Sequence, residues 1–186
     1  ATPTISITGL VTNVVMSSGS TSFTATDIAT SALVARSVFA ADMDGDGDMD
    51  IVSASEGSAS DNGTIAWYEN DGAADPTWAA ANIATSLSRP MSVFAADMDR
   101  DGDMDIVSAS KGDGTIAWYE NNGAADPTWA AANIATSLLR SMSVFAADMD
   151  GDGDMDIVSA SSEDNTIAWY ENCLLYTSDA ADDLVG

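Results

Sequence analysis

Short apolar runs separated by polar turns recur along the chain and predict β-strands. In one stretch, residues 37–41, 51–55 and 64–69 are rich in β-branched, aromatic and small side chains, and Gly, Asp or Asn lies between the runs. A fourth and weaker run, residues 78–85, follows Pro76. Its alanines would also suit a helix, but the proline and the polar residues around it favour a strand. The four runs predict one antiparallel, four-stranded unit.

The whole pattern repeats along the chain. The segment 42–50 returns at 97–105 and at 148–156, so the copies start 55 and then 51 residues apart. Residues 97–121 and 148–172 are identical at 21 of 25 positions. The difference in spacing falls in a polar segment after the second strand, which indicates a surface loop. Four strands in a unit of roughly 50 residues are typical of a β-propeller blade, so the sequence predicts an all-β fold with about three blades.

The predicted boundaries follow from this repeat. Residues 23–31 match the fourth run, so we expect the last strand of a preceding blade there, then two full units and three strands of a third, twelve strands in all. The predicted segments are 1–22, a β-like segment with no assigned role; 23–172, the repeats (23–36 end of a preceding blade, 37–91 repeat 1, 92–142 repeat 2, 143–172 incomplete repeat 3); and 173–186, a tail. Propellers close with about 4–8 blades. We therefore expect a fragment of a larger propeller, closed by the remaining blades or by oligomerisation.

The tail departs from the repeat. After Asn172 the chain does not continue as the earlier units do, and residues 173–183 resemble the translation of an adapter used in sequencing libraries. The resemblance implies that the tail is not native and that the protein continues beyond Asn172; the alternative is a genuine C-terminal extension. Cys173, the one cysteine, cannot form an intramolecular disulfide and gives no indication of the redox compartment.

Aromatic pairs stand at one fixed place in each unit: Trp67 and Tyr68, Trp118 and Tyr119, Trp169 and Tyr170. Adjacent residues of a strand face opposite sides, so we expect one ring of each pair to pack on each neighbouring blade. Stacking on a sugar is the functional alternative. The aromatic residues that open the fourth runs, Phe23, Trp78 and Trp129, are expected to be core residues as well.

The charge of the chain limits the classes of partner that it can bind. Thirty acidic and five basic residues give a formal net charge of −25, and there is no histidine. Such a surface repels nucleic acid and anionic membranes, and no apolar run is long enough for membrane insertion. The three repeated loops hold 15 of the 30 acidic residues. Carboxylates this close repel one another unless a cation lies among them.

The spacing within these loops suits calcium. Carboxylates at positions 1, 3 and 5 of a tight loop converge, glycine at position 6 allows the turn, position 7 offers its carbonyl, and an acid at position 9 closes the shell. Ca²⁺ prefers six to eight such oxygen ligands. An EF-hand needs Glu at position 12 between helices, whereas serine stands there in all three loops; a solvated acidic turn without an ion is the plain alternative. We predict about three Ca²⁺ ions, one per loop, at Asp42, Asp44, Asp46, Asp48, Asp50, Asp97, Asp99, Asp101, Asp103, Asp105, Asp148, Asp150, Asp152, Asp154 and Asp156, with the position-7 side chains adding field rather than ligating.

The motif Asp-x-Asp-x-Asp-Gly-x-x-Asp between two β runs resembles the FG-GAP repeat of integrin α-chain propellers. With residues 64–70 following, it is most similar to the bacterial FG-GAP-like, or VCBS, repeats, and the resemblance covers residues 23–172. The Phe-Gly and Gly-Ala-Pro signatures are absent, since Ala40 follows Phe39 and residues 51–54 stand where the second would be. The resemblance implies a propeller with calcium between the first two strands of each blade. It also implies a secreted or cell-surface protein, although no signal peptide is visible in this segment.

Nothing in the sequence is arranged for catalysis. There is no histidine to act as a base, no plausible cysteine nucleophile, and no visible partner to activate a serine. We therefore expect a calcium-stabilised binding or adhesion module, not an enzyme, with an unknown protein or glycan as its ligand. The alternatives are a non-catalytic scaffold within a larger secreted lyase or hydrolase, and a simple spacer.

Overall fold

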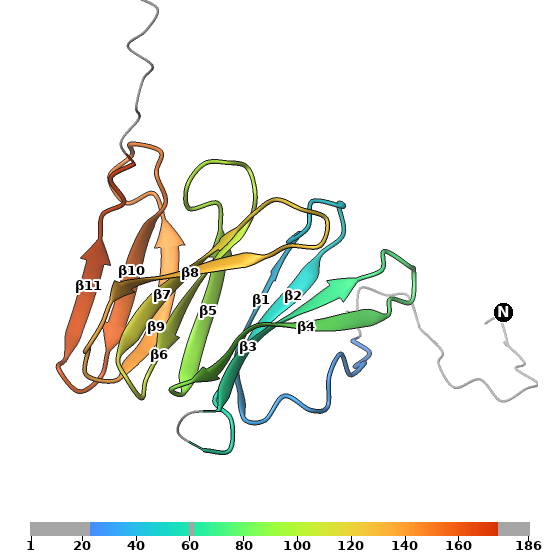
Figure 1. Ribbon diagram of the computed structural model, residues 1–186, viewed down its shortest axis with the longest axis horizontal. Helices are drawn as coiled ribbons and strands as arrows, with labels where there is room; N and C mark the ends of the chain where they lie inside the picture. The colour runs from blue at the N-terminus through green and yellow to red at the C-terminus, as the bar shows by residue number, and fades with distance from the viewer. Residues whose placement is uncertain (1–22, 60–61, 175–186) are drawn as a thin grey trace, which may run out of the picture.

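The computed structural model describes residues 23–59 and 62–174, and these form three antiparallel β-sheets side by side (Figure 1). The first two sheets have four strands each and the third has three, always in chain order. No helix forms in the described residues, so the prediction of an all-β fold of four-stranded blade units is confirmed. The described sheets do not close into a ring, and they correspond to the blades of a partial propeller.

Eleven strands make up the three sheets. The first sheet contains β1 (Ala35–Ala41), β2 (Asp50–Ser55), β3 (Gly63–Asn70) and β4 (Trp78–Leu87). The second contains β5 (Pro90–Ala96), β6 (Asp105–Ser110), β7 (Thr115–Asn121) and β8 (Trp129–Ala135). The third contains β9 (Ser141–Ala147), β10 (Asp156–Ser161) and β11 (Thr166–Tyr170). We call the sheets blades 1, 2 and 3.

The fourth run of each full unit is a strand, as predicted, but its copy at residues 23–31 is not. In blades 1 and 2 this run pairs with the third strand of its own sheet. Residues 23–31 have no such strand beside them among the described residues, and an extended segment whose backbone groups find no partner is not held as a strand. The predicted twelfth strand is therefore wrong for this structure. The predicted segment 1–22 and most of the tail lie outside the described residues.

The core lies between the blades. Register places Phe39, Val52 and Trp67 across one face of blade 1, and two clusters of buried side chains fill the spaces between blades 1 and 2 and between blades 2 and 3. The prediction for the aromatic pairs is confirmed in blade 2: Tyr119 lies in the first cluster and Trp118 packs against the second. Phe23 is 93% exposed, so its predicted core role is wrong here, since none of the described blades covers it.

The same contacts join each pair of neighbouring blades. Phe94 lies between Phe39 and Phe145 with ring centroids 4.4 Å apart on both sides. Ser37 Oγ accepts a hydrogen bond from the backbone N–H of Val93, and Ser92 Oγ accepts one from Val144, at 3.3 and 3.2 Å. Burial of apolar rings provides most of the free energy at such an interface, while the hydrogen bonds fix how far one blade slides on the next.

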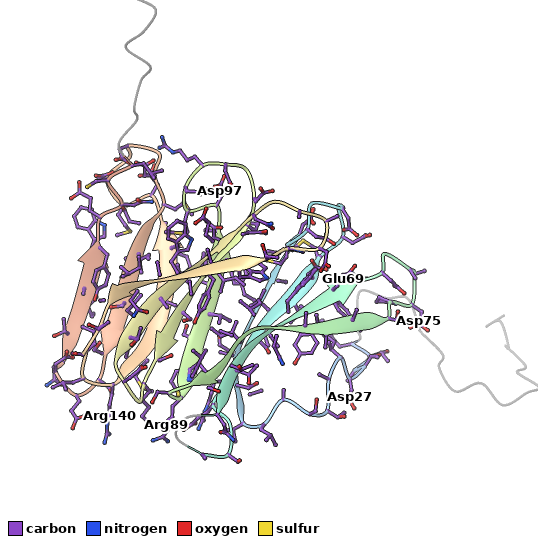
Figure 2. All side chains as sticks on the ribbon, in the orientation of Figure 1. Asp27, Glu69, Asp75, Arg89, Asp97 and Arg140 are labelled. Carbon is purple, nitrogen blue, oxygen red and sulfur yellow. The ribbon has the colours of Figure 1, made fainter. Side chains whose placement is uncertain are left out.

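Charge is unevenly distributed along the blades. The Asp loops lie at one end of the sheets, where Figure 2 labels Asp97, and Arg89 and Arg140 lie at the opposite end. There the carboxylate of Glu56 accepts hydrogen bonds from Arg36 and Arg89, which hold the pKa of Glu56 below its usual range. This ion pair connects the first two blades. No helix of the described part of the chain has the length and apolar character needed to cross a membrane.

A further hydrogen bond, donated by an asparagine side chain, crosses each interface between blades. Its contribution to stability can be tested by mutation. Asn121 Nδ2 donates to the carbonyl of Met43 in blade 1 at 2.8 Å, and Asn172 Nδ2 donates to that of Met98 at 2.7 Å. Asn70 occupies the same position in blade 1 but bonds only within its own blade, to the carbonyl of Met49.

We expect Asn121→Ala to lower the free energy of unfolding by about 1–3 kcal/mol more than Asn70→Ala, because only the first change leaves a buried carbonyl of another blade without its donor. Urea unfolding of dilute protein, followed by tryptophan fluorescence, measures the difference. Equal losses for the two variants would show that the bond between blades contributes nothing of its own.

Candidate metal centres

Each Asp loop connects the first two strands of a blade, and its shape depends on the residue at position 6. Gly47, Gly102 and Gly153 have φ values of 97°, 99° and 92°, a region open mainly to glycine. This left-handed turn reverses the chain between the two strands. It also lets the carboxylates on either side of the turn face the same space.

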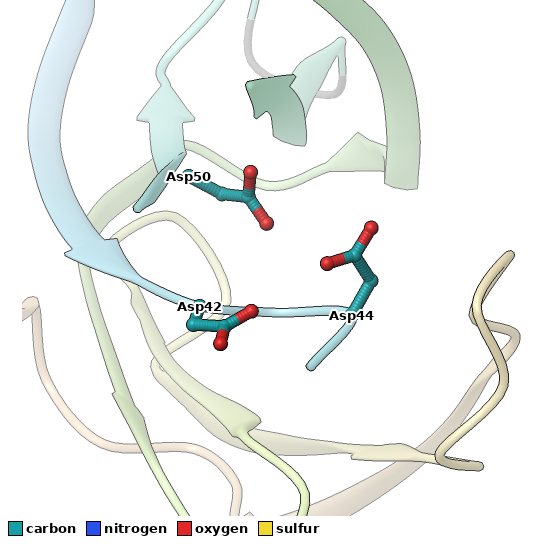
Figure 3. Close-up of side chains that lie close together, drawn as sticks. All are labelled: Asp42, Asp44 and Asp50. Carbon is teal, nitrogen blue, oxygen red and sulfur yellow. The ribbon is translucent and has the colours of Figure 1, made fainter. Parts of the chain in front are cut away.

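Three sets of carboxylates converge, one in each loop. They are Asp42, Asp44 and Asp50 in the first loop, Asp97, Asp99 and Asp101 in the second, and Asp148, Asp150 and Asp152 in the third, and each set has oxygens within 4.8 Å of one another. Figure 3 shows the first set, whose side chains turn toward a common space. The residues at positions 1 and 3 therefore belong to all three sets, whereas the third member comes from position 5 or position 9.

The aspartate at position 9 is the most buried residue of each loop. Asp50 accepts hydrogen bonds from the backbone N–H groups of Met43 in the loop, at 3.1 Å, and of Asn70 at the end of β3, at 2.8 Å. Asp105 and Asp156 make the same two bonds in their own blades. This carboxylate therefore joins the Asp loop to the third strand of its blade. Position-9 Asp was predicted as a ligand, and its role as an anchor is a feature that the loop motif alone does not indicate.

The position-7 side chains join none of the three sets. A Cβ placed on Gly72 would collide with the carboxylate of Asp48, and one on Gly123 with that of Asp103. These two aspartates therefore lie against the turn that follows the third strand, where the glycines leave room for them. That position 7 contributes its side chain as charge and not as a ligand stays a prediction.

Arg100 links the second loop to the third. It stands at position 4, where the other loops have glycine, with a φ of 65°. Its guanidinium donates to the backbone carbonyls of Asp152 and Gly153 at 2.9 and 3.0 Å, and its Nε lies 2.7 Å from the carboxylate of Asp154. The left-handed backbone is costly for a residue other than glycine, and these contacts with the next blade offset the cost. The sequence showed the substitution but not its contacts.

Burial and mutual repulsion disfavour the charged carboxylates. Burial raises the pKa of Asp44, and the neighbouring Asp46 and Asp50 raise it further. The pKa of Asp99 is raised in the same way, by burial first and then by Asp101 and Glu120. Burial also raises the pKa of Asp105 to about 6, although backbone N–H groups oppose the shift. At neutral pH the first two loops therefore hold charge at a cost that a bound cation would relieve. In the third loop burial also acts on Asp156, but hydrogen bonds from backbone N–H groups outweigh it and lower the pKa of this carboxyl.

The donor sets fit a hard divalent cation. All converging atoms are carboxylate oxygens, which suit Ca²⁺ and Mg²⁺, whereas the chain has no histidine and its single cysteine lies outside the loops. Asp97 Oδ1 is buried and has no hydrogen-bond partner. A buried, unsatisfied carboxylate oxygen costs free energy, and its position at the converging set is where a cation would satisfy it.

Comparison with known proteins agrees with the repeat and its loops. The chain matches the FG-GAP-like repeat family over residues 42–108 and again over residues 97–159, which together span more than half of the sequence. Each match begins at the first aspartate of one loop and extends through the next, into the strand that follows it. No curated protein matches the chain. The resemblance predicted from the Asp motif is thus confirmed, and the chain belongs to the FG-GAP-like repeat family.

Proposed function

We propose that each of the three Asp loops binds one Ca²⁺ ion and that the ions stabilise the stack of blades. The observation that carries this proposal is the convergence of three carboxylates in every loop, with the unpartnered Asp97 Oδ1 among them. Three copies of one arrangement make an accidental cluster of acids a poor explanation. The aspartates at positions 1, 3, 5 and 9 and the backbone carbonyl at position 7 would hold the ion.

Calcium suits these loops better than magnesium. Ca²⁺ accepts irregular shells of six to eight oxygens, whereas Mg²⁺ demands a near-ideal octahedron and keeps several waters. The third carboxylate of the set comes from position 9 in one loop and from position 5 in the others. A site whose members vary in this way favours the ion with the more flexible geometry.

The bound ion would act on the fold and not on a reaction. It gathers carboxylates that otherwise repel one another and fixes the loop between the first two strands of the blade. Because Asp50 and its equivalents also bond to the end of the third strand, the effect extends across the sheet. Arg100 carries it further, from the second loop to the third.

At the level of the whole module, we propose a non-catalytic binding or adhesion role in an extracellular setting. FG-GAP-like repeats are typical of extracellular propellers. Calcium modules outside the cell often have dissociation constants of about 10⁻⁴–10⁻³ M, which only the extracellular ion concentration satisfies. The rigid stack holds its three loops at one end, where a protein or glycan ligand has access. A screen of glycans and candidate proteins in calcium, repeated in chelator, tests this role, and a complete lack of binding partners would contradict it.

Calcium removal should lower the melting temperature, and excess Ca²⁺ should restore it. At an ion concentration about 100 times the dissociation constant, each occupied site adds about 2.7 kcal/mol to the stability.

Calorimetric titration of the chelator-treated chain measures the number of Ca²⁺ ions bound per chain, for which we expect three. Asp99→Asn should reduce it to two, while Asp75→Asn, which removes the same charge from an exposed turn outside the loops, should leave it at three. A melting temperature unaffected by chelator would exclude structural calcium.

The pH dependence of stability should change sign when calcium is added. In the ion-free chain, the pKa of Asp105 is about 6 in the folded state and lies near 3.9 when unfolded, so the folded state binds more protons between these values. Lowering the pH from about 7 to 5 should therefore stabilise the ion-free chain by about 1 kcal/mol. With calcium present the same change should destabilise it, because protons compete with the ion.

Chemical denaturation at a series of pH values, with chelator or with calcium, measures both slopes. Asp105→Asn is the matched variant, since it keeps one acceptor oxygen but cannot titrate. We expect it to flatten the slope of the ion-free chain. An ion-free chain that loses stability steadily from pH 7 to 5 would contradict the assignment.

A further inference from the structure

Blade 3 exposes one face to solvent. In blades 1 and 2 the equivalent face is covered by the blade that follows. Phe145, Ile167 and Trp169 lie on this face of blade 3 and are 54%, 82% and 50% exposed. The residues equivalent to Ile167 in blades 1 and 2, Ile65 and Ile116, are fully buried by the blade that follows them. Large exposed apolar residues gathered on one sheet face mark an interaction surface.

The first blade has the complementary exposed face. Val38 of β1 is 67% exposed, whereas its equivalents Val93 and Val144 are each 4% exposed because they pack on the preceding blade. The stack thus ends in two different apolar faces, one on blade 1 and one on blade 3. These two blades lie at opposite ends of the ribbon (Figure 1). The two interfaces inside the chain show which face binds which: the face of Phe39 and Val52 receives the face of Val93 and Tyr119.

The chain enters blade 1 through the same connection that joins one blade to the next. Val34, Arg89 and Arg140 precede the first strands of the three blades, and their φ values are 57°, 60° and 58°. Their carbonyls accept equivalent hydrogen bonds from Glu56, Lys111 and Ser162 at 3.0, 2.9 and 3.1 Å. A positive φ is strained for a β-branched residue such as Val34. Residues 31–34 therefore retain the geometry of a crossover from a neighbouring blade, although the described residues contain no blade before them.

The third blade lacks the strand that such a crossover would follow. Within the described residues it consists of β9, β10 and β11, and the outer edge of β11 is unpaired. Unpaired edges are templates for another strand. Residues 23–31 match the fourth runs of blades 1 and 2, sharing Ile-Ala-Thr-Ser at their ends, yet they pair with no strand of the described residues.

We propose that a second copy of this chain docks its blade 1 on the open face of blade 3, and that residues 23–31 of that copy pair with β11 as the missing fourth strand. The pairing of β7 with β8 fixes the register: Ala29 of the second copy lies opposite Ile167, Thr26 opposite Trp169, and Thr24 opposite Glu171.

The contacts of this interface follow from the two inside the chain. Phe39 of the second copy stacks on Phe145, as Phe145 does on Phe94. Ser143 Oγ accepts a hydrogen bond from the N–H of Val38 of the second copy, as Ser92 does from Val144. Asn70 of the second copy donates to the carbonyl of Met149, as Asn172 does to that of Met98. Each of these donors and rings is present in the chain: among the described residues, Asn70 bonds only within its own blade, and Phe145 stacks on a ring on one side only.

The contact is head-to-tail, so it either closes into a ring or extends without end. Two copies of three blades would make a ring of six, within the range of about 4–8 blades at which propellers close. We therefore expect a dimer in which each copy donates one strand and receives one. Like charge opposes the association, since each copy carries a formal charge of −25, so the dimer should form more readily at about 0.15 M salt than in its absence.

Light scattering coupled to size-exclusion chromatography, over a range of protein concentrations in salt, tests the association. We expect a dimer for the full chain and a monomer for Trp169→Asp, which places a charge in the interface. Leu139→Asp puts the same charge on an exposed apolar residue of the crossover between blades 2 and 3 and should remain dimeric. Circular dichroism confirms that both variants are folded, and Asn70→Ala should weaken the dimer without unfolding it. A full chain that is monomeric at every concentration overturns the proposal.

Disulfide trapping tests the donated strand. In a Cys173→Ser background, a chain with Glu171→Cys is mixed with a chain carrying Thr24→Cys under mild oxidation. We expect a cross-linked dimer of the two chains on a non-reducing gel, whereas Thr30→Cys, out of register with position 171, should give far less. A dimer in solution that cross-links equally with both would mean that the copies associate in another way, and it would overturn the strand exchange.

Discussion

The fold of each blade depends on one buried carboxylate, the aspartate that ends the Asp loop. In all three blades it accepts a hydrogen bond from the loop through one oxygen and from the end of the third strand through the other. The loop between the first two strands is thereby tied to the third. The asparagine at the end of that strand then reaches the loop of the preceding blade. A continuous series of hydrogen bonds thus connects the Asp loop of one blade, through the end of its third strand, to the Asp loop of the preceding blade.

This arrangement connects ion binding with the stability of the stack. A buried carboxylate is costly when charged, and in blade 2 this cost raises the pKa of Asp105. Protonation or a cation lowers the cost, but only a cation also satisfies the other aspartates of the loop. The blades have few alternatives for stabilisation, because each sheet is small and the described residues contain no disulfide. Loops of this kind are therefore better understood as part of the core than as surface decoration, and an ion bound there would act on the interfaces between blades.

Much of the fold could be predicted from the sequence because the repeat fixes both strand pattern and strand number. Ile51, Trp67 and their copies recur at fixed spacing, and period-two alternation then assigns their faces. The prediction failed at residues 23–31, because a segment with the sequence of a fourth strand forms a strand only when a neighbouring strand lies beside it. The aspartates at positions 1, 3 and 5 were expected to converge and do so in the second and third loops, whereas in the first loop position 9 takes the place of position 5. Which position supplies the third carboxylate depends on how Asp50 or Asp101 turns once the backbone bonds of the loop are made. The hydrogen bonds of Arg100 depend on how close the third Asp loop lies to the second. That distance cannot be predicted from the local sequence.

Near-identical repeats impose a constraint of their own. If one surface of a blade binds the opposite surface of the next, then every stack of such blades ends in two faces that fit each other. The strained backbone of Val34 keeps the form of a crossover between blades, although the described residues contain no blade before it. Each added blade buries one apolar face and exposes another, so a stack of such blades always has an exposed apolar face at each end. Closing the stack into a ring buries both end faces. The geometry of the two interfaces between the described blades therefore limits which partner can fit the end faces.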